Sequence, residues 1–537
     1  MTRRPDIVLV LADDMGFSDI GCFGGEIETP NIDRLAREGV RFTQFYNTAR
    51  CSPSRASLLT GLHPHQVGVG ILNFDDTPDG YPGNLSERCV TAAEALQDAG
   101  YATYLSGKWH LASDMDTPNG SWPTRRGFDR FFGTLEGAGS FYRPRTLTRD
   151  ETNVEHEADQ PGWYYTDAIS DHAVSFVEEH DAARGDDPFF LYLAYTAPLW
   201  PLHAHEDDVR RYDGRFDAGW DVLREERLAR LEKEGIVTDE HGGTALAERD
   251  PRVPAWADNP DPDWDARRMQ VYAAQVDRMD QGIGRLLDTL ERLGRLDDTL
   301  VVFLSDNGGC AEELDHDFVT AFVPLRDTTR EGEPVTPGNV PGLVPGGEST
   351  YMSYGRAWAH LSNTPFREYK HWVHEGGIAT PLVARWPAGL DETGVEAGTL
   401  HRRPHQLVDV LPTLLQAAGA AYPDSRGGRP VPEAEGRSML PALRGESAED
   451  RDLFWEHEGN SAVRSGPWKL VRKHGRPWEL YAIGTDRAEQ HDLADEHADV
   501  VAELEERYEV WARRCGVIPR EVVLDLYARR GKGLPPE

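Results

Sequence analysis

The sequence predicts an α/β protein in which a large, mostly parallel sheet lies between layers of helices, followed by a small C-terminal α+β domain. Short apolar runs alternate with helical segments of ten residues or more, a pattern typical of parallel strands in one sheet. The predicted strands are residues 7–12, 101–105, 189–195 and 300–305, and the helices between them include residues 91–99, 165–179 and 269–293. Ligands of such sheets bind at the carboxyl ends of the strands.

Further segments complete this outline. Helices are predicted over residues 31–38, 54–62 and 406–418, and a linker rich in Gly and Pro follows the last of them. Beyond the linker, the predicted elements are short strands at 453–456, 462–464, 468–472 and 479–482 and a helix at 499–514. We therefore divide the chain into a large domain, residues 1–447, and a small subdomain of antiparallel sheet plus helix, residues 448–537.

A charged insertion interrupts the large domain at about residues 203–265. Its stretch RFDAGWDVLREERLARLEKEG predicts an exposed helix and loop. Such a segment is either a solvated cover or a wall over a binding pocket, because loops on a rigid scaffold often carry binding residues. The sequence leaves both interpretations open.

The charge balance limits the partners that the chain can have. It contains 57 Lys and Arg against 92 Asp and Glu, a net charge of −35. This excess argues against nucleic acid as a partner, because phosphate contacts need clustered basic side chains. No apolar run reaches the roughly 18 residues of a membrane span, so no membrane partner is expected.

Cysteine usage favours a cytoplasmic location. The chain has 5 cysteines, an odd number, and none is spaced as CxxC, which does not suit a disulfide framework. The first apolar run, at residues 7–12, leads directly into two aspartates and is too short for a secretory signal.

Polar pairs follow two of the predicted strands. Asp13 and Asp14 come after residues 7–12, and Asp306 and Asn307 come after residues 300–305. Adjacent carboxylates repel each other, and a cation relieves that repulsion. Because all four side chains offer oxygen ligands, Ca²⁺ is favoured, Mg²⁺ or Mn²⁺ is acceptable, and Zn²⁺ is disfavoured. Each pair is also compatible with an ordinary turn or helix cap.

The segment CSPSRASLLTG begins at Cys51. Pro53 suits the first turn of a helix, so Cys51 is expected at a helix N-terminus, where partial positive charge favours an anion. On this ground Cys51 is either a nucleophile of low pKa or an inert buried thiol.

Several motifs in order resemble one family. They are LADDMGFSDIGCFGG, TPNIDRLAREGVRFTQFY, CSPSR, YLSGKWHL, SDNGG and HEGGIATPLVARWP. The chain resembles the type I, formylglycine-dependent sulfatases of the alkaline phosphatase superfamily, and is most similar to the cytosolic bacterial arylsulfatases. The resemblance implies a large mixed, mostly parallel sheet sandwiched by helices.

The same resemblance implies a reaction. A separate formylglycine-generating enzyme, a transient partner, would oxidise Cys51 to Cα-formylglycine. A Ca²⁺ ion would be held by Asp13, Asp14, Asp306, Asn307 and the modified residue 51. One hydroxyl of the hydrated aldehyde would attack the sulfur of a small sulfate ester, with aryl sulfates favoured, giving a covalent sulfated intermediate. The second hydroxyl would then expel sulfate.

Four cationic or basic side chains receive roles from the resemblance. Arg55 would hold the hydrated aldehyde, and Lys108 would bridge it to the sulfate. His110 would be the base for the release of sulfate. Lys370 would contact the sulfate or the leaving oxygen.

The sequence departs from the family at Leu199. Related enzymes carry a histidine in the corresponding Ala-Pro-His segment, whereas this chain has Ala197-Pro198-Leu199. Leucine cannot donate a proton to the leaving oxygen, a contribution typically worth ~10²–10⁴ in rate. His203 and Lys370 are the candidate substitutes, and a substrate with a good leaving group would need neither.

Two alternative functions stay open. A phosphodiesterase or phosphonate monoester hydrolase of the same superfamily shares this chemistry, but usually has Asp-His where this chain has Asp306 and Asn307. An impaired sulfatase-fold binding protein would explain Leu199, but the intact motif at Cys51 and both metal pairs argue against it. We do not expect metal at the histidine pairs His63/His65 and His371/His374, which lack a matching set of ligands.

Overall fold

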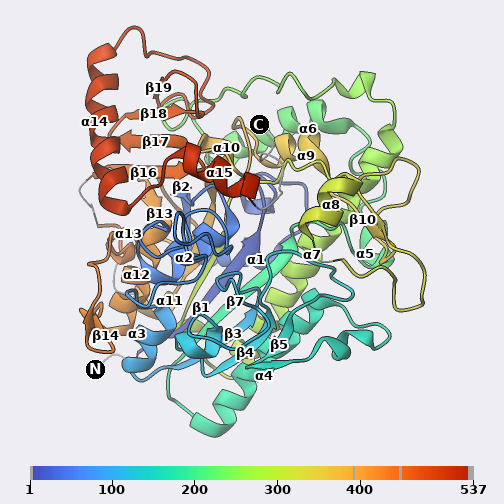
Figure 1. Cartoon of the computed structure of the whole chain (residues 1–537), viewed down its shortest axis with the longest axis vertical. Helices are drawn as coiled ribbons and strands as arrows, with labels where there is room; N and C mark the ends of the chain where they lie inside the picture. The colour runs from blue at the N-terminus through green and yellow to red at the C-terminus, as the bar shows by residue number, and fades with distance from the viewer. Residues whose placement is uncertain (1–3, 324, 391–393, 447–449, 530–537) are drawn as a thin grey trace.

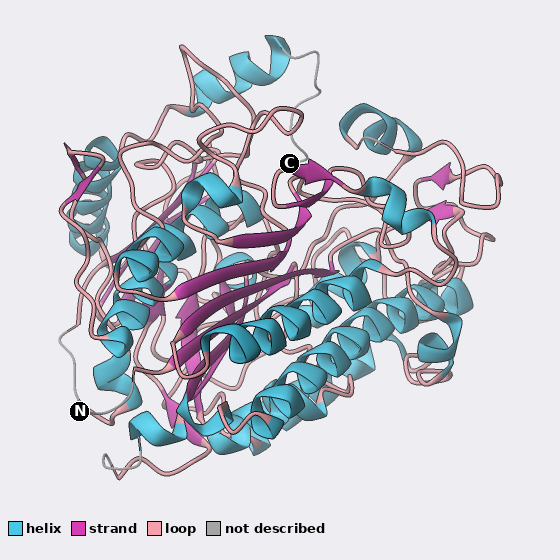
Figure 2. Ribbon diagram, turned by 90° about the horizontal axis from the view of Figure 1, so that it is seen from below, coloured by secondary structure: helices cyan, strands magenta, loops and turns pink. Residues whose placement is uncertain are grey.

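The computed structural model describes residues 4–323, 325–390, 394–446 and 450–529 (Figures 1 and 2). The expected domain boundary between residues 447 and 448 lies outside these residues. Within them, no helix is long and apolar enough to cross a membrane.

The core is an 11-stranded sheet with helices on both faces, seen edge-on in Figure 2. Its strands are β1 (Asp6–Asp13), β2 (Val40–Tyr46), β3 (Ala102–Gly107), β4 (Arg130–Thr134), β5 (Leu147–Arg149), β6 (Thr152–Asn153), β7 (Phe189–Pro198), β8 (Thr299–Ser305), β11 (Ala379–Arg385), β12 (Thr399–His401) and β13 (His405–Gln406). Strand β1 lies between β7 and β8 and is parallel to both. Because β11 runs antiparallel to β8 and to β2, the sheet is mixed but mostly parallel, which confirms the predicted fold class.

Alternation along β1 divides the hydrophobic core into two layers. Val8 and Val10 face the layer that includes α1 (Pro30–Glu38), α4 (Tyr165–Arg184) and α7 (Pro262–Arg292). Ile7, Leu9 and Leu11 face the layer that includes α2 (Cys51–Thr60), α3 (Ala92–Asp98) and α12 (Val410–Ala418). Successive side chains of a strand point to opposite faces, so a continuous apolar run is what a strand covered on both sides requires.

Shorter elements surround this core. They are α8 (His316–Phe322), α9 (Gly355–Ser362), α10 (Glu375–Ile378), α11 (Pro387–Leu390), α13 (Leu440–Leu443), β9 (Thr336–Pro337), β10 (Thr350–Tyr351), β14 (Ser425–Arg426) and β15 (Arg429–Pro430).

The C-terminal region is an antiparallel sheet with helices. Strands β16 (Leu453–His457), β17 (Asn460–Ser465), β18 (Trp468–Arg472) and β19 (Glu479–Ala482) pair in sequence order, and α14 (Ala498–Cys515) packs against them. The last helix, α15 (Arg520–Arg529), leaves this unit and contacts the loop after α2 through Val523 and Tyr527 (Figure 1).

The insertion is more than a solvated cover. It contains α5 (Glu206–Arg210) and α6 (Gly219–Lys233), and Trp220, Leu223 and Leu231 of α6 are buried in the main core. Arg227 is also buried and pairs with Asp19 and Glu26. The prediction of a wholly exposed helix was therefore wrong, because its arginines reach partners inside the fold.

Candidate active site

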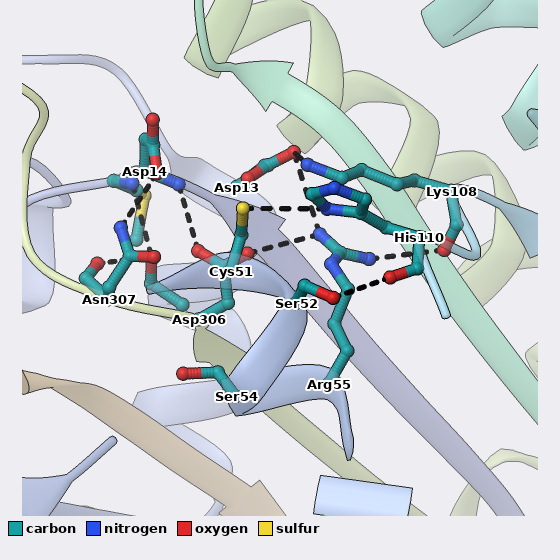
Figure 3. A network of polar contacts seen from close by, with 12 residues as sticks. Asp13, Asp14, Cys51, Ser52, Ser54, Arg55, Lys108, His110, Asp306 and Asn307 are labelled. Carbon is teal, nitrogen blue, oxygen red and sulfur yellow. Dashed lines mark hydrogen bonds and ion pairs between the residues drawn. The ribbon is translucent and has the colours of Figure 1, made fainter. Parts of the chain in front are cut away.

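The two predicted polar pairs meet at the carboxyl edge of the sheet. Ala12 of β1 is in register with Ser305 of β8, so both strands end at the same level. Asp13, Asp14 and Asp306 each place a carboxylate oxygen within 4.8 Å of the others. Asn307 adjoins them and donates from Nδ2 to Asp14 Oδ1 at 2.6 Å (Figure 3).

This cluster is fully buried, and two of its oxygen atoms have no hydrogen-bond partner in the described part of the chain. Burial raises the pKa of Asp13 to about 6 and also raises the pKa of Asp14. Asp13 Oδ1 and Asn307 Oδ1 are buried and have no hydrogen-bond partner among the described residues. Closely spaced oxygen ligands with free lone pairs fit a hard divalent cation such as Ca²⁺ or Mg²⁺.

Each carboxylate of the cluster has a buried cationic partner, and Arg55 pairs with Asp13 as well as with Asp306. Lys108 donates to Asp13, Lys370 Nζ to Asp14 Oδ2 at 2.7 Å, and Arg55 Nη2 to Asp306 Oδ2 at 3.2 Å. Arg55 comes from the first turns of α2, Lys108 from the end of β3, and Lys370 from the loop before α10. Three of the four predicted cationic or basic groups therefore lie directly on the predicted metal site.

Cys51 is the first residue of α2, three positions before the predicted helix start at residue 54. Burial raises the pKa of the Cys51 thiol, although Lys108 and Lys370 oppose that rise. A raised pKa does not favour the interpretation of Cys51 as a thiolate nucleophile.

His110 stands next to Cys51. Its Nδ1 lies 3.5 Å from Cys51 Sγ, and its carbonyl accepts a hydrogen bond from Ser52 Oγ at 2.7 Å (Figure 3). Burial, then Lys108 and Arg55, lower the pKa of the imidazole well below its usual value, so the ring is neutral at physiological pH. A neutral imidazole can accept a proton, as the predicted base must.

Beside the cluster lies a cavity of about 500 Å³, which its neighbours Cys51 and Lys370 line. Cys51, His110, Leu199 and Lys370 line it, together with Leu72, Phe74, Met115, Glu136, Trp200, Phe318 and Trp372. The insertion, described over all of residues 203–265, contributes none of the lining residues. The interpretation of the insertion as a pocket wall was therefore wrong.

His203 does not lie on this cavity. Its Nδ1 accepts from the Phe141 backbone N–H at 3.3 Å, and its Nε2 donates to the Thr350 carbonyl at 2.7 Å. It lines a second, smaller cavity. The hydrogen bond to Thr350 of β10 holds the His203 ring in the smaller cavity. The structure thus separates His203 from the candidate residues that line the larger cavity.

Some residues of the site were missed by sequence reasoning. Glu136 lines both cavities, and Glu312 joins Arg50 to Trp200 on the wall of the larger one. His371 lies with His457 and Glu458 of the C-terminal sheet, their ligand atoms within 4.8 Å of one another. No motif marks these residues, since they come from segments far apart in the sequence and only the fold brings them together.

Comparisons with known proteins agree with this geometry. The sulfatase family model matches residues 5–420. An uncharacterized sulfatase of Schizosaccharomyces pombe is 32% identical, over 96% of this chain and 95% of that protein. The arylsulfatase of Klebsiella aerogenes is 33% identical over 80% of this chain and 90% of its own, and mouse steryl-sulfatase is 30% identical over 87% and 69%.

Solved structures share the fold. The structure of Ps i-CgsB in complex with k-i-k-neocarrahexaose superposes with a TM-score of 0.67 at 25% identity, covering 98% of both chains. The phosphonate monoester hydrolase of Silicibacter pomeroyi has a TM-score of 0.59 at 19% identity, covering 95% of this chain and 96% of its own, and at that identity shares the fold alone.

A mixed sheet with a buried acidic cluster at its carboxyl edge, beside a cysteine that begins a helix, is the framework of an alkaline phosphatase superfamily hydrolase. Within that superfamily, the chain belongs to the sulfatase family. It is a hydrolase of sulfuric esters.

Proposed function

We propose that this sulfatase acts on aryl sulfates, binds Ca²⁺ at Asp13, Asp14, Asp306 and Asn307, and uses Cys51 after its conversion to Cα-formylglycine. The observation that carries the proposal is the position of Cys51, which shares one buried site with three carboxylates and with Lys108 and Lys370. A thiol of raised pKa is a poor nucleophile, so the motif at residue 51 needs the modification to be useful.

The metal would supply charge for the chemical step. When bound, Ca²⁺ neutralises the carboxylate cluster and favours ionisation of a hydroxyl beside it. Hydration of the modified residue 51 would provide two hydroxyl groups, one to attack sulfur with formation of a sulfated residue and one to allow its release.

The surrounding side chains would bind and move protons. Lys108 and Lys370 extend from opposite sides of the cluster, where their ammonium groups can bind the anionic oxygens of a sulfate. Neutral His110, 3.5 Å from Cys51 Sγ, would accept the proton that must leave residue 51 before sulfate is released. Arg55, between Asp306 and the carbonyl of Lys108, holds the cluster in place.

The lining of the cavity suits an aromatic substrate. Phe74, Trp200, Phe318 and Trp372 line its walls, with Leu72 and Met115 beside them. Flat apolar walls around a charged end favour a substrate with a planar ring attached to a sulfate. The names of two relatives, an arylsulfatase and a steryl-sulfatase, are in keeping with this choice.

The partner enzyme must reach Cys51 before the fold closes over it. Cys51 is only 4% exposed, and every residue of α2 is buried. We therefore place the conversion before α2 packs against the sheet.

Co-expression with a formylglycine-generating enzyme tests the proposal. The purified chain should hydrolyse 4-nitrophenyl sulfate, and mass spectrometry of the peptide spanning residue 51 should show the aldehyde. Cys51→Ala should abolish turnover, whereas Cys515→Ala, at a buried cysteine far along the chain, should retain it. A phenylphosphonate ester assayed in parallel tests the rival activity: faster turnover of that ester than of the sulfate would contradict the proposal.

A further inference from the structure

Glu136 is a buried carboxyl group with an unusual environment. It follows β4 and is 6% exposed, and neither carboxyl oxygen has a hydrogen-bond partner in the part of the chain that the structure describes. It lines the large cavity together with Cys51, His110 and Leu199. The adjacent Gly137 packs against the His110 ring, which places this stretch of backbone beside the proposed base.

Other carboxyl groups along the cavity have partners. Glu312 accepts from Arg50 and Trp200, and its pKa is held well below its usual value. Glu458 accepts from Arg520 and Tyr527, Asp315 from the Phe318 backbone N–H, and Glu313 from the Arg356 backbone N–H. Glu136 is thus the carboxyl group of the described cavity wall whose two oxygens lack a hydrogen-bond donor, which makes it the candidate proton donor.

The surroundings of Glu136 favour its neutral form. Burial raises its pKa to about 8, although the positive charge of Arg145 opposes that rise. Glu155 adds to the rise and Arg326 opposes it, while the hydroxyl groups of Tyr165 and Tyr351 are the further titratable groups that interact with its charge. A pKa raised in this way favours the protonated form of Glu136 at neutral pH.

We infer that Glu136 protonates the leaving oxygen of the sulfate ester, the role that Leu199 cannot perform in this chain. The inference rests on the proposed function. As the S–O bond breaks, its electron pair stays on the leaving oxygen, and the Glu136 proton moves to that oxygen. The alcohol or phenol departs neutral and Glu136 is left as a carboxylate. Lys370 is a weaker candidate for this role because its ammonium group is engaged by Asp14.

The second cavity offers a route by which Glu136 can regain its proton from water. It has a volume of about 20 Å³, room for a single water molecule. Glu136 lines it opposite Arg143, Arg145 and Arg326, whose positive charges stabilise the carboxylate formed in the reaction. Glu136 therefore lines both the cavity of the reacting group and a small cavity bordered by arginines.

The test is the Glu136→Gln variant, assayed on phenyl sulfates of graded leaving-group pKa. Gln has nearly the shape of the protonated acid, so the fold should be retained, as thermal unfolding will verify. We expect kcat/KM to fall ~10²–10⁴-fold for unsubstituted phenyl sulfate, which needs the proton, and to change only a few-fold for 4-nitrophenyl sulfate. Glu435→Gln, at a partly buried glutamate that lines neither cavity, is the matched control and should match wild type.

The wild-type enzyme provides a second readout. For phenyl sulfate, kcat/KM should fall as pH rises through about 8, because the acid loses its proton, and 4-nitrophenyl sulfate should not show this limb. Equal losses for both esters in Glu136→Gln, or the same basic limb for both in wild type, would overturn the inference. If wild type with verified formylglycine hydrolyses neither ester, the proposed function itself fails.

Discussion

At the scale of single residues, the site depends on close approach of backbone to side chain. Gly137 is an example: a Cβ atom there would lie 2.2 Å from His110 Nε2. His110 itself has a positive φ of 59°, so its ring has little freedom to move aside. The absence of a side chain at Gly137 therefore allows the His110 ring to occupy its position in the site.

We predict that Gly137→Ala lowers kcat for 4-nitrophenyl sulfate by ~10²-fold, because a 1 Å displacement of a reacting group can cost that much. Gly120→Ala, where no atom lies within 4 Å of the new methyl group, is the control and should leave kcat unchanged. Steady-state kinetics of both variants decides the matter, and wild-type kcat in Gly137→Ala would show that His110 tolerates movement.

Sequence reasoning succeeded at this scale where the chemistry is local. The pairs Asp13-Asp14 and Asp306-Asn307 were placed together because both follow parallel strands. The acidity of Cys51 could not be judged, since the depth of burial depends on segments remote in sequence. Glu136 was missed for the same reason, because the sequence does not show that this glutamate is buried without hydrogen-bond donors.

At the scale of elements, long apolar or strongly periodic segments were predicted well. Strand β1 and helix α4 differ from prediction only at their ends. Strands β2 and β11 were not predicted, because their antiparallel pairing joins residues more than 300 positions apart. Helix α6 was taken as exposed because its arginines look solvated, although Arg227 makes buried ion pairs.

The buried arginine of α6 leads to a stability prediction. Arg227→Met should lower the free energy of unfolding by about 3–5 kcal/mol, since Asp19 would be left as a buried charge without its cationic partner and Glu26 would keep only Arg230. Arg210→Met on exposed α5 should cost less than about 1 kcal/mol. Denaturant unfolding of both variants measures the difference, and equal stabilities would mean that the insertion is only loosely attached.

At the scale of the whole molecule, buried charges join the C-terminal sheet to the central sheet. Lys469 of β18 donates to Glu375 Oε1 at 3.0 Å and to Glu489 Oε1 at 2.8 Å. Arg487 Nε donates to Glu375 Oε2 at 3.0 Å, and Tyr46 of β2 donates to the same oxygen at 2.9 Å. Glu458 and Tyr527 of α15 also line the large cavity, so the C-terminal region contributes residues to the site.

Packing of the C-terminal sheet against the central sheet depends on Lys469, which donates to both Glu375 and Glu489. Burial raises the pKa of Glu375, but Lys469 and then Arg487 outweigh it and lower the pKa to about 2. A carboxyl group whose pKa falls below the ordinary 4.5 contributes stability above that pH, and the contribution is lost as pH falls through about 2. Lys469→Met removes the principal cation and leaves two buried carboxylates.

We predict that Lys469→Met lowers the free energy of unfolding by about 3–5 kcal/mol at pH 7. The deficit should shrink toward pH 4, because in the variant burial is no longer opposed by Lys469 and Glu375 can take up a proton at a higher pH than in wild type. Lys473→Met, at a partly exposed lysine of the same sheet region, should cost about 1 kcal/mol or less. Unfolding followed at pH 7 and pH 4 separates the two effects. A deficit that stays constant across that range would mean that packing, rather than charge, attaches the C-terminal sheet to the site.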